Sequence, residues 1–249
     1  MNIKSNYIKP KFKKESNPKV GLLALSTDLT IEKDFNSICY KLPLDIFVNR
    51  IHNENPLTKE NLLKMYEQIE SITEKILPGE KINTVAYACT SGTIAIGEEK
   101  VKEKIQLAKP GCNVTTPITS AIKAFNKMNV KNIAVLTPYP ESVNETISEH
   151  LIKKNINVIS FSTFNLDLDV DFARIDPKYL SEILVKLNIN NADALFVSCT
   201  ALPALEIIDE VEKKINKPVF SSNQTLIWDT IRSAGYKNSI MGYGKLFIN

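Results

Sequence analysis

The chain has 249 residues, of which 43% are hydrophobic and 24% are charged. These proportions argue against long disorder, and the length permits one large domain or two lobes of about 100–150 residues each. The net charge of +3 comes largely from lysines near the N-terminus, so we expect no nucleic-acid partner. No stretch reaches the roughly 18–20 apolar residues that cross a bilayer, and no signal-peptide core is present. We therefore expect a cytoplasmic protein with no membrane partner.

Short apolar runs alternate with stretches of helical periodicity along the chain. The expected strands are, in chain order, 20–25, 45–48, 84–88, 133–136, 158–161, 194–197 and 218–220. Apolar residues spaced by three or four positions predict helices between them, for example over 62–76 and over 202–211. Strands that alternate with helices form parallel sheets flanked by helices, so we expect an α/β fold.

Three segments recur in the same order in the two halves of the chain. Residues 85–91 resemble 195–201, residues 114–122 resemble 219–227, and residues 20–23 resemble 133–136, at displacements of 110, 105 and 113 positions. This repeat predicts two similar, closely packed α/β lobes with a cleft between them. The predicted division is 18–116 plus 219–249 for the N-terminal lobe, 117–218 for the second lobe, and 1–17 for an extended basic leader.

Four cysteines lie far apart with no C-x-x-C pair, so we expect free thiols: Cys39, Cys89, Cys112 and Cys199. Cys89 and Cys199 each end an apolar strand, precede a predicted helix and are followed by hydroxyl residues. A helix N-terminus can lower the pKa of a thiol below ~8.5 and favour the reactive thiolate. Free cysteine is often a buried space filler, which we prefer for Cys39 and Cys112. The repeat favours a catalytic pair for the other two.

Two opposed thiols suit proton transfer at a carbon next to a carboxylate, one as thiolate base and the other as thiol acid. They equally suit attack by one thiol and protonation by the other. The chain has no P-loop, no G-x-G-x-x-G after a strand, no H-E-x-x-H and no acidic metal cluster, so we expect no cofactor and no metal.

Residues 85–92 and 198–202 resemble the two cysteine motifs of the aspartate/glutamate racemase superfamily. Within it, the chain resembles the branch of maleate cis-trans isomerase, arylmalonate decarboxylase and, above all, the ectoine-utilisation protein A group. The further similar strings are 24–30, 48–51, 76–80, 136–139 and 222–224. The resemblance extends from Val20 to Gly235.

This resemblance implies two pseudo-symmetric flavodoxin-like lobes and catalysis without a cofactor. It implies that Cys89 is the nucleophile or base and that Cys199 is the opposing acid. The residues expected to bind substrate are Thr27, Asp28, Thr90, Ser91, Tyr139 and Thr200. Decarboxylases of this branch keep only the second cysteine, so the two thiols favour an isomerase or racemase, with ectoine or amino-acid catabolism as its setting.

Asp28 departs from the asparagine that maleate isomerases have after the first strand. It is interpreted either as a helix cap or as the partner of a substrate ammonium group, because a second carboxylate would repel a dianion. The expected substrate is therefore a small amino or dicarboxylic acid. A lyase or decarboxylase on a related acid and a non-catalytic small-molecule binding protein are the alternatives. Association into a homo-oligomer is left open, because no surface stripe identifies a contact.

Overall fold

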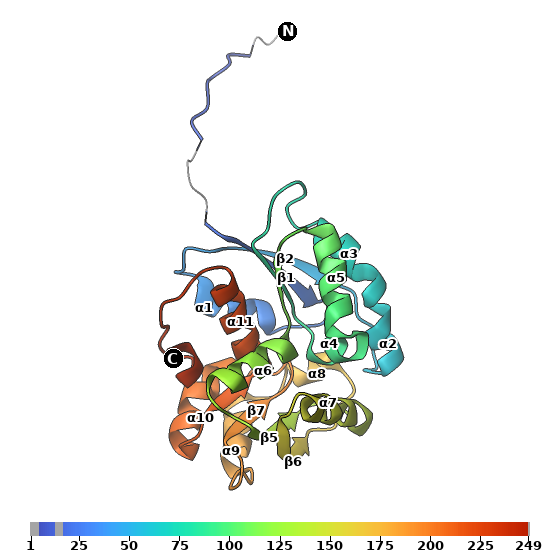
Figure 1. Ribbon diagram of the computed structural model, residues 1–249, viewed down its shortest axis with the longest axis vertical. Helices are drawn as coiled ribbons and strands as arrows, with labels where there is room; N and C mark the ends of the chain where they lie inside the picture. Colours follow the sequence, from blue (N-terminus) through green and yellow to red (C-terminus); the bar gives the residue numbers. More distant parts are fainter. Residues whose placement is uncertain (1–4, 13–16, 249) are drawn as a thin grey trace.

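The structure is a computed structural model that describes residues 5–12 and 17–248, and it contains two parallel four-stranded sheets (Figure 1). The first sheet has the order β2-β1-β3-β4, and the second has the order β6-β5-β7-β8. The strands are β1 (Lys19–Leu25), β2 (Asp45–Ile51), β3 (Thr84–Tyr87), β4 (Asn113–Thr115), β5 (Asn132–Thr137), β6 (Asn157–Thr163), β7 (Ala194–Val197) and β8 (Val219–Ser221). The two orders are the same when each strand number is advanced by four, which confirms the predicted α/β fold with two lobes.

Helices connect the strands and cover the sheets. They are α1 (Ile31–Cys39), α2 (Lys59–Lys64), α3 (Tyr66–Glu74), α4 (Thr90–Ile96), α5 (Glu98–Ala108), α6 (Pro117–Lys127), α7 (Glu141–Lys153), α8 (Asp169–Phe172), α9 (Pro177–Lys186), α10 (Ile208–Ile215) and α11 (Ser222–Ser233), with 3-10 turns at Leu205–Ile207 and Lys245–Ile248. The strands β3 and β7 are buried along their whole length, because each lies inside its sheet with helices on both faces. The edge strand β6 has exposed residues instead.

Two of the predicted helices differ from those observed. The expected helix over 62–76 is divided into α2 and α3 at Met65. The expected helix over 202–211 begins only at Ile208, after a 3-10 turn, because a residue that precedes proline, here Leu202 before Pro203, is disfavoured in helical conformation. Cys199 is therefore followed by a turn rather than by the helix that the sequence predicts.

The helices α6 and α11 are exchanged between the two sheets. The ring of Phe125 in α6 packs edge-on against Phe196 of β7 and Phe220 of β8, with ring centroids 5.3 and 5.1 Å apart. In return, the hydroxyl of Thr230 in α11 lies 2.7 Å from that of Thr115 in β4. The two helices lie side by side in the middle of the molecule (Figure 1). Each lobe is thus completed by the helix that follows the last strand of the other.

This exchange corrects one part of the predicted division. The sequence places the last strand and helix, from residue 219 onward, on the N-terminal lobe. The helix α11 does contact β3 and β4 of the first sheet, but β8 pairs in parallel with β7 in the second sheet. The remaining lobe boundaries stay predictions.

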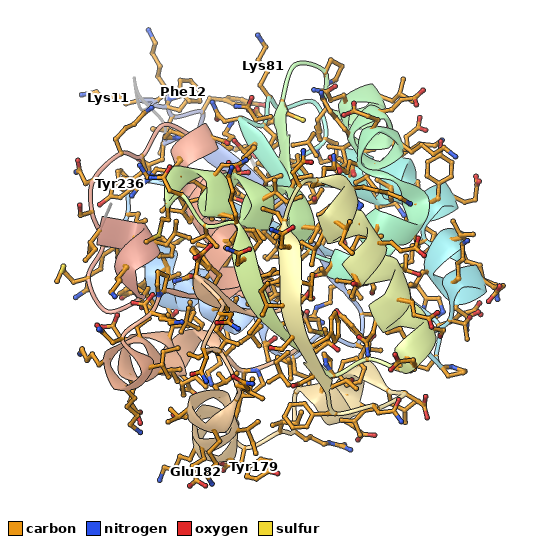
Figure 2. All side chains as sticks on the ribbon, turned by 60° about the horizontal axis from the view of Figure 1, so that its bottom comes forward. Lys11, Phe12, Lys81, Tyr179, Glu182 and Tyr236 are labelled. Carbon is orange, nitrogen blue, oxygen red and sulfur yellow. The ribbon has the colours of Figure 1, made fainter. Side chains whose placement is uncertain are left out.

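Residues 5–12 of the predicted leader are exposed and have no regular secondary structure, and Lys11 and Phe12 lie at the periphery of the molecule (Figure 2). The other predicted leader positions at 1–4 and 13–16 lie outside the described residues. Across the described part of the chain, no helix is long and apolar enough to cross a membrane.

We expect Phe125→Ala to lower the free energy of unfolding by about 3–5 kcal/mol, because it removes a buried ring that joins α6 to two strands of the second sheet. Urea denaturation followed by circular dichroism measures the change. The matched control is Leu107→Ala on α5, whose side chain is 59% exposed and whose loss is expected to change the stability by no more than ~0.5 kcal/mol. Equal effects of the two substitutions would contradict the role of Phe125.

Candidate active site

Cys89 lies just beyond the carboxyl end of β3 and is the N-cap residue of α4. Its Sγ accepts a hydrogen bond from the backbone N–H of Gly92 at 3.2 Å and lies 3.8 Å from the hydroxyl of Ser91. A Cβ atom at Gly92 would stand only 2.8 Å from this sulfur, so the close approach requires glycine. The thiol is 3% exposed. The short strand and the tight helix start thus fix the sulfur within the protein.

Cys199 occupies the equivalent place beyond β7. Its Sγ accepts a hydrogen bond from the backbone N–H of Ala201 at 3.3 Å, and the Tyr139 side chain is its hydrogen-bond partner. The backbone oxygen of Tyr139 accepts hydrogen bonds from Asn144 Nδ2 at 2.8 Å and from Thr163 Oγ1 at 2.6 Å. These contacts fix the position of the tyrosine, and through it the environment of the second sulfur.

The two cysteine segments are in direct contact. The hydroxyl of Thr200, the residue after the second cysteine, donates to the backbone oxygen of Ala88, the residue before the first, at 3.3 Å. The backbone oxygen of Thr200 in turn accepts from Thr30 Oγ1 and from Asn223 Nδ2. Both thiols also act electrostatically on the Tyr139 hydroxyl. The structure therefore brings the two thiols to one shared site.

Asp28 caps the start of α1, as one of the two interpretations expects. Its Oδ1 accepts from the backbone N–H groups of Thr30 and Ile31 at 2.8 and 2.9 Å. Its Oδ2 is buried and has no hydrogen-bond partner among the described residues. The cap therefore occupies only one of the two carboxylate oxygens.

Asp169, at the start of the four-residue helix α8, is a buried carboxylate that the sequence analysis missed. Its Oδ2 accepts from Thr27 Oγ1 at 2.9 Å and from Asn53 Nδ2 at 2.7 Å. Asn53 follows β2 and Asp169 follows β6, which are equivalent strands of the two lobes. A search for polar residues after every strand, rather than after the cysteine strands alone, could have found both. Their hydrogen bond joins the second lobe to the first.

Burial dominates the electrostatics of both thiols. It raises the pKa of Cys89 to about 12, with further increases from the nearby Asp169 and Asp28 carboxylates, and only the Gly92 N–H and the Ser91 hydroxyl oppose it. Burial likewise raises the pKa of Cys199 well above its ordinary value. The expectation that helix ends lower these pKa values is therefore wrong. A single N–H donor at each sulfur does not offset the loss of hydration.

Burial also raises the pKa of the Asp28 and Asp169 carboxyl groups. The charge of Asp28 raises the pKa of Asp169 further, because both carboxylates are removed from water. Within residues 5–12 and 17–248, no group of three or more histidine, cysteine, aspartate or glutamate side chains could hold a metal ion.

The remaining predicted residues all lie in this hydrogen-bonded neighbourhood. Thr27 donates to Asp169, Ser91 faces the sulfur of Cys89, and Thr90 Oγ1 donates to Ser222 Oγ at 3.0 Å. Ser91 also lines a cavity of about 140 Å³ between α2, α4 and α7. The other residues that line this cavity are Lys59, Leu62, Ile94, Ala95, Ser142, Val143, Thr146 and Ile147. The roles of the predicted residues in binding and catalysis stay predictions.

Each lobe contains one parallel sheet and presents one buried thiol to a shared site. These features define a class of pseudo-symmetric two-cysteine α/β proteins. The sequence profile of the arylmalonate decarboxylase family matches residues 60–247, more than half of the chain. The chain therefore belongs to the arylmalonate decarboxylase family.

Known proteins agree with this assignment. The chain is 23% identical to a maleate isomerase of Geobacillus stearothermophilus over 244 residues, which cover 92% of this chain and 96% of that protein. It is 29% identical to an arylmalonate decarboxylase of Bordetella bronchiseptica over 140 residues, which cover 55% of this chain and 58% of that protein. The fold matches the crystal structure of the maleate isomerase Iso from Pseudomonas putida S16 with a TM-score of 0.85 and 20% identity, over 93% of this chain and 98% of that chain.

A second structure has the same fold. It is a cysteine mutant of the Nocardia farcinica maleate cis-trans isomerase with a covalently bound succinylcysteine intermediate, which matches with a TM-score of 0.85 and 18% identity over 93% of this chain and 98% of that chain.

We expect iodoacetamide to alkylate the folded protein slowly at pH 8. A thiol whose pKa is about 12, as at Cys89, has a thiolate fraction roughly a thousandfold smaller at this pH than a thiol of ordinary pKa. The labelling rate of Cys89, followed by peptide mass spectrometry, is therefore expected to keep rising about tenfold per pH unit above pH 9, where the rate of a thiol of ordinary pKa (~8.5) levels off. The same protein unfolded in urea is the control and should react at the ordinary rate. Rapid labelling of folded Cys89 at neutral pH would contradict the effect of burial.

Proposed function

We propose that the protein is a cofactor-independent isomerase or racemase that acts at the carbon next to a carboxylate of a small acid. The observation that carries the proposal is the contact between the two cysteine segments, because Thr200 and Ala88 join the ends of two equivalent strands. Two thiols that approach one site from different lobes can address opposite faces of a bound carbon atom. The relatives named maleate isomerase support this choice of reaction class.

In the proton-transfer form of the reaction, Cys89 as thiolate takes the hydrogen from the substrate carbon. The C–H bond breaks, an S–H bond forms, and the electron pair moves into the adjoining carboxylate. The Cys199 thiol then gives its hydrogen to the opposite face of the same carbon. A buried thiolate is a strong base once formed, because its conjugate thiol has a raised pKa.

In the addition form, the Cys89 sulfur bonds to one carbon of a double bond and Cys199 protonates the other. Rotation about the resulting single bond and reversal of both steps yield the other geometric isomer. Exchange between cis and trans isomers follows this form, with a covalent cysteine adduct as its intermediate. Both forms require both thiols, which is why we favour them over decarboxylation.

In this proposal the carboxylate of the substrate binds Thr90, Ser91 and Tyr139, with help from the backbone N–H of Thr200, as the resemblance implies. Tyr139 supports this placement because its hydroxyl lies next to Cys199 and its ring is held edge-on against Phe172, with ring centroids 5.7 Å apart. The hydroxyl of Thr90 donates to Ser222 at the start of α11, and its role in substrate binding stays a prediction. The setting in ectoine or amino-acid catabolism, the membership of the ectoine-utilisation group, the cytoplasmic location and any homo-oligomer stay predictions.

The test is exchange of the hydrogen at the substrate carbon in heavy water, followed by nuclear magnetic resonance over a panel of small amino acids and dicarboxylic acids. We expect exchange or isomerisation that falls by roughly 100-fold or more in both Cys89→Ser and Cys199→Ser, because each substitution removes one acid–base group. Cys112→Ser is the matched control, since Cys112 is buried outside the site and should leave the rate unchanged.

Other outcomes identify the alternatives. Release of carbon dioxide with only Cys199 required would favour a decarboxylase. Protection of the thiols by an acid that is never converted would favour a binding protein. Full activity without either thiol would contradict the proposed mechanism.

A further inference from the structure

We propose that the site binds the ammonium group of an amino-acid substrate between the carboxylates of Asp28 and Asp169, beside the two thiols. The inference rests on the proposed function, because it names the class of small acid on which Cys89 and Cys199 act. It places a positive group where the chain itself supplies acidic side chains from two lobes.

The two carboxylates belong to one hydrogen-bonded arrangement. Asp28 follows Thr27 directly in the chain, and Thr27 Oγ1 donates to Asp169 Oδ2 at 2.9 Å. Asn53 Nδ2 donates to the same oxygen at 2.7 Å. Neither of these two hydrogen bonds involves Asp169 Oδ1. The two aspartates are only 1% and 4% exposed. Both carboxylates are therefore held in place before any ligand arrives.

Asp28 has an acceptor that the protein does not use. Its Oδ1 accepts from Thr30 and Ile31 as the cap of α1, but its Oδ2 is buried without a partner among the described residues. A hydrogen bond from the Thr200 hydroxyl lowers the pKa of Asp28, although the same hydroxyl also donates to the backbone oxygen of Ala88 at 3.3 Å. A buried carboxylate oxygen without a donor costs free energy, so a donor from a bound ligand would stabilise it. An ammonium group carries three N–H donors and a positive charge, so it supplies both a hydrogen-bond donor and a counter-charge for the carboxylate.

The charges around the pair favour a cation over an anion. Each carboxylate raises the pKa values of Cys89 and Cys199, which shows that their fields reach both thiols. Arg50 binds the backbone oxygen of Asp28 at 2.9 Å, but its guanidinium is paired with Glu32 at 2.8 Å and does not neutralise the carboxylate. A dicarboxylate dianion would add a like charge here, whereas an amino acid brings its own counter-charge.

The arrangement fits racemisation. With the ammonium group on Asp28 and Asp169 and the carboxylate near Tyr139, the substrate carbon lies toward the sulfurs. Cys89 thiolate takes its hydrogen as the C–H bond breaks, and the Cys199 S–H bond breaks as a new C–H bond forms on the opposite face. The ammonium group is unchanged, and the negative charge passes from one sulfur to the other.

The first experiment screens the full-length protein for ligands by thermal unfolding with the common L-amino acids and with maleate. Each amino acid that raises Tm is then compared, by titration calorimetry, with its 2-hydroxy analogue, which lacks only the ammonium group. We expect at least one amino acid to bind about 10- to 100-fold more tightly than its analogue, because the analogue leaves the carboxylates without a counter-charge. The absence of any stabilising amino acid, or equal binding of the analogue or of maleate, overturns the proposal.

Calorimetry in buffers of different ionisation enthalpy gives a second readout. Burial raises the pKa of both carboxyl groups, and a bound ammonium group opposes this shift because it stabilises the charged carboxylates. The other titratable groups that face the pair are Cys89, Cys199, Tyr139 and, behind Asp28, Asp34. We expect no proton uptake when the amino acid binds, because the ammonium group lowers the pKa of both carboxyl groups; proton uptake overturns the proposal.

Asp169→Asn keeps the shape of the side chain and removes its charge. We expect it to weaken amino-acid binding about 10- to 100-fold and to accelerate alkylation of both thiols, because the carboxylate raises their pKa values. Asp171→Asn is the matched control. Asp171 lies on the same short helix, is half-exposed and pairs with Arg174, so its loss should change neither quantity. Unchanged amino-acid affinity in Asp169→Asn overturns the proposal.

The two proposals fail in different ways. Amino-acid binding that depends on Asp169 but gives no exchange in heavy water keeps the ammonium pocket and overturns the isomerase. Thiol-dependent conversion of a dicarboxylic acid without binding of any amino acid keeps the isomerase and overturns the ammonium pocket.

Discussion

The active site depends on one contact, the hydrogen bond from the Thr200 hydroxyl to the backbone oxygen of Ala88. Each of these residues adjoins a cysteine that extends beyond the carboxyl end of a central strand. Since the ends of β3 and β7 must approach each other for this bond to form, the two sheets cannot rotate far without separating the sulfurs. Asp169 adds a second connection, because it receives hydrogen bonds from Thr27 and Asn53 of the other lobe. The chemistry of the site is therefore a property of the interface between the lobes.

Burial at this interface raises the free energy of the charged forms of its acidic side chains. Two carboxyl groups and two thiols are removed from water together, and each has a raised pKa as a result. Such a site keeps its thiols protonated until a ligand changes the local field, and it makes the charged form of its carboxyl groups less favourable. A ligand with the right charge distribution then acts both as the substrate and as the agent that sets the protonation of the residues around it.

The sequence predicted the two repeated cysteine segments and missed Asp169. The recurrence around Cys89 and Cys199 predicted two lobes and a shared site, because apolar strands with a cysteine at the end are a strong local signal. Asp169 was not predicted as a site residue, because α8 has only four residues and no apolar periodicity that would indicate a helix there. The pKa of Cys89 was expected to fall, but sequence shows the helix end and not the depth of burial, and depth decides the sign. Likewise, the end of the chain was predicted to return to the first lobe, and only α11 does so, because strand pairing is set by partners distant in sequence.

The exchange of α6 and α11 bears on how such a chain could arise. If the repeat records a gene duplication, a single-lobe precursor would have lacked the helix that covers its own sheet, and two copies would have had to trade helices in a domain-swapped dimer. Fusion of the copies would have converted that exchange of helices between molecules into the exchange within one chain, which is seen in the packing of Phe125 against the second sheet. In such a history the symmetry between the halves could then be lost at individual positions, as it has after the cysteines, where Cys89 is followed by α4 and Cys199 by a turn, while the mutual dependence of the halves for folding remained.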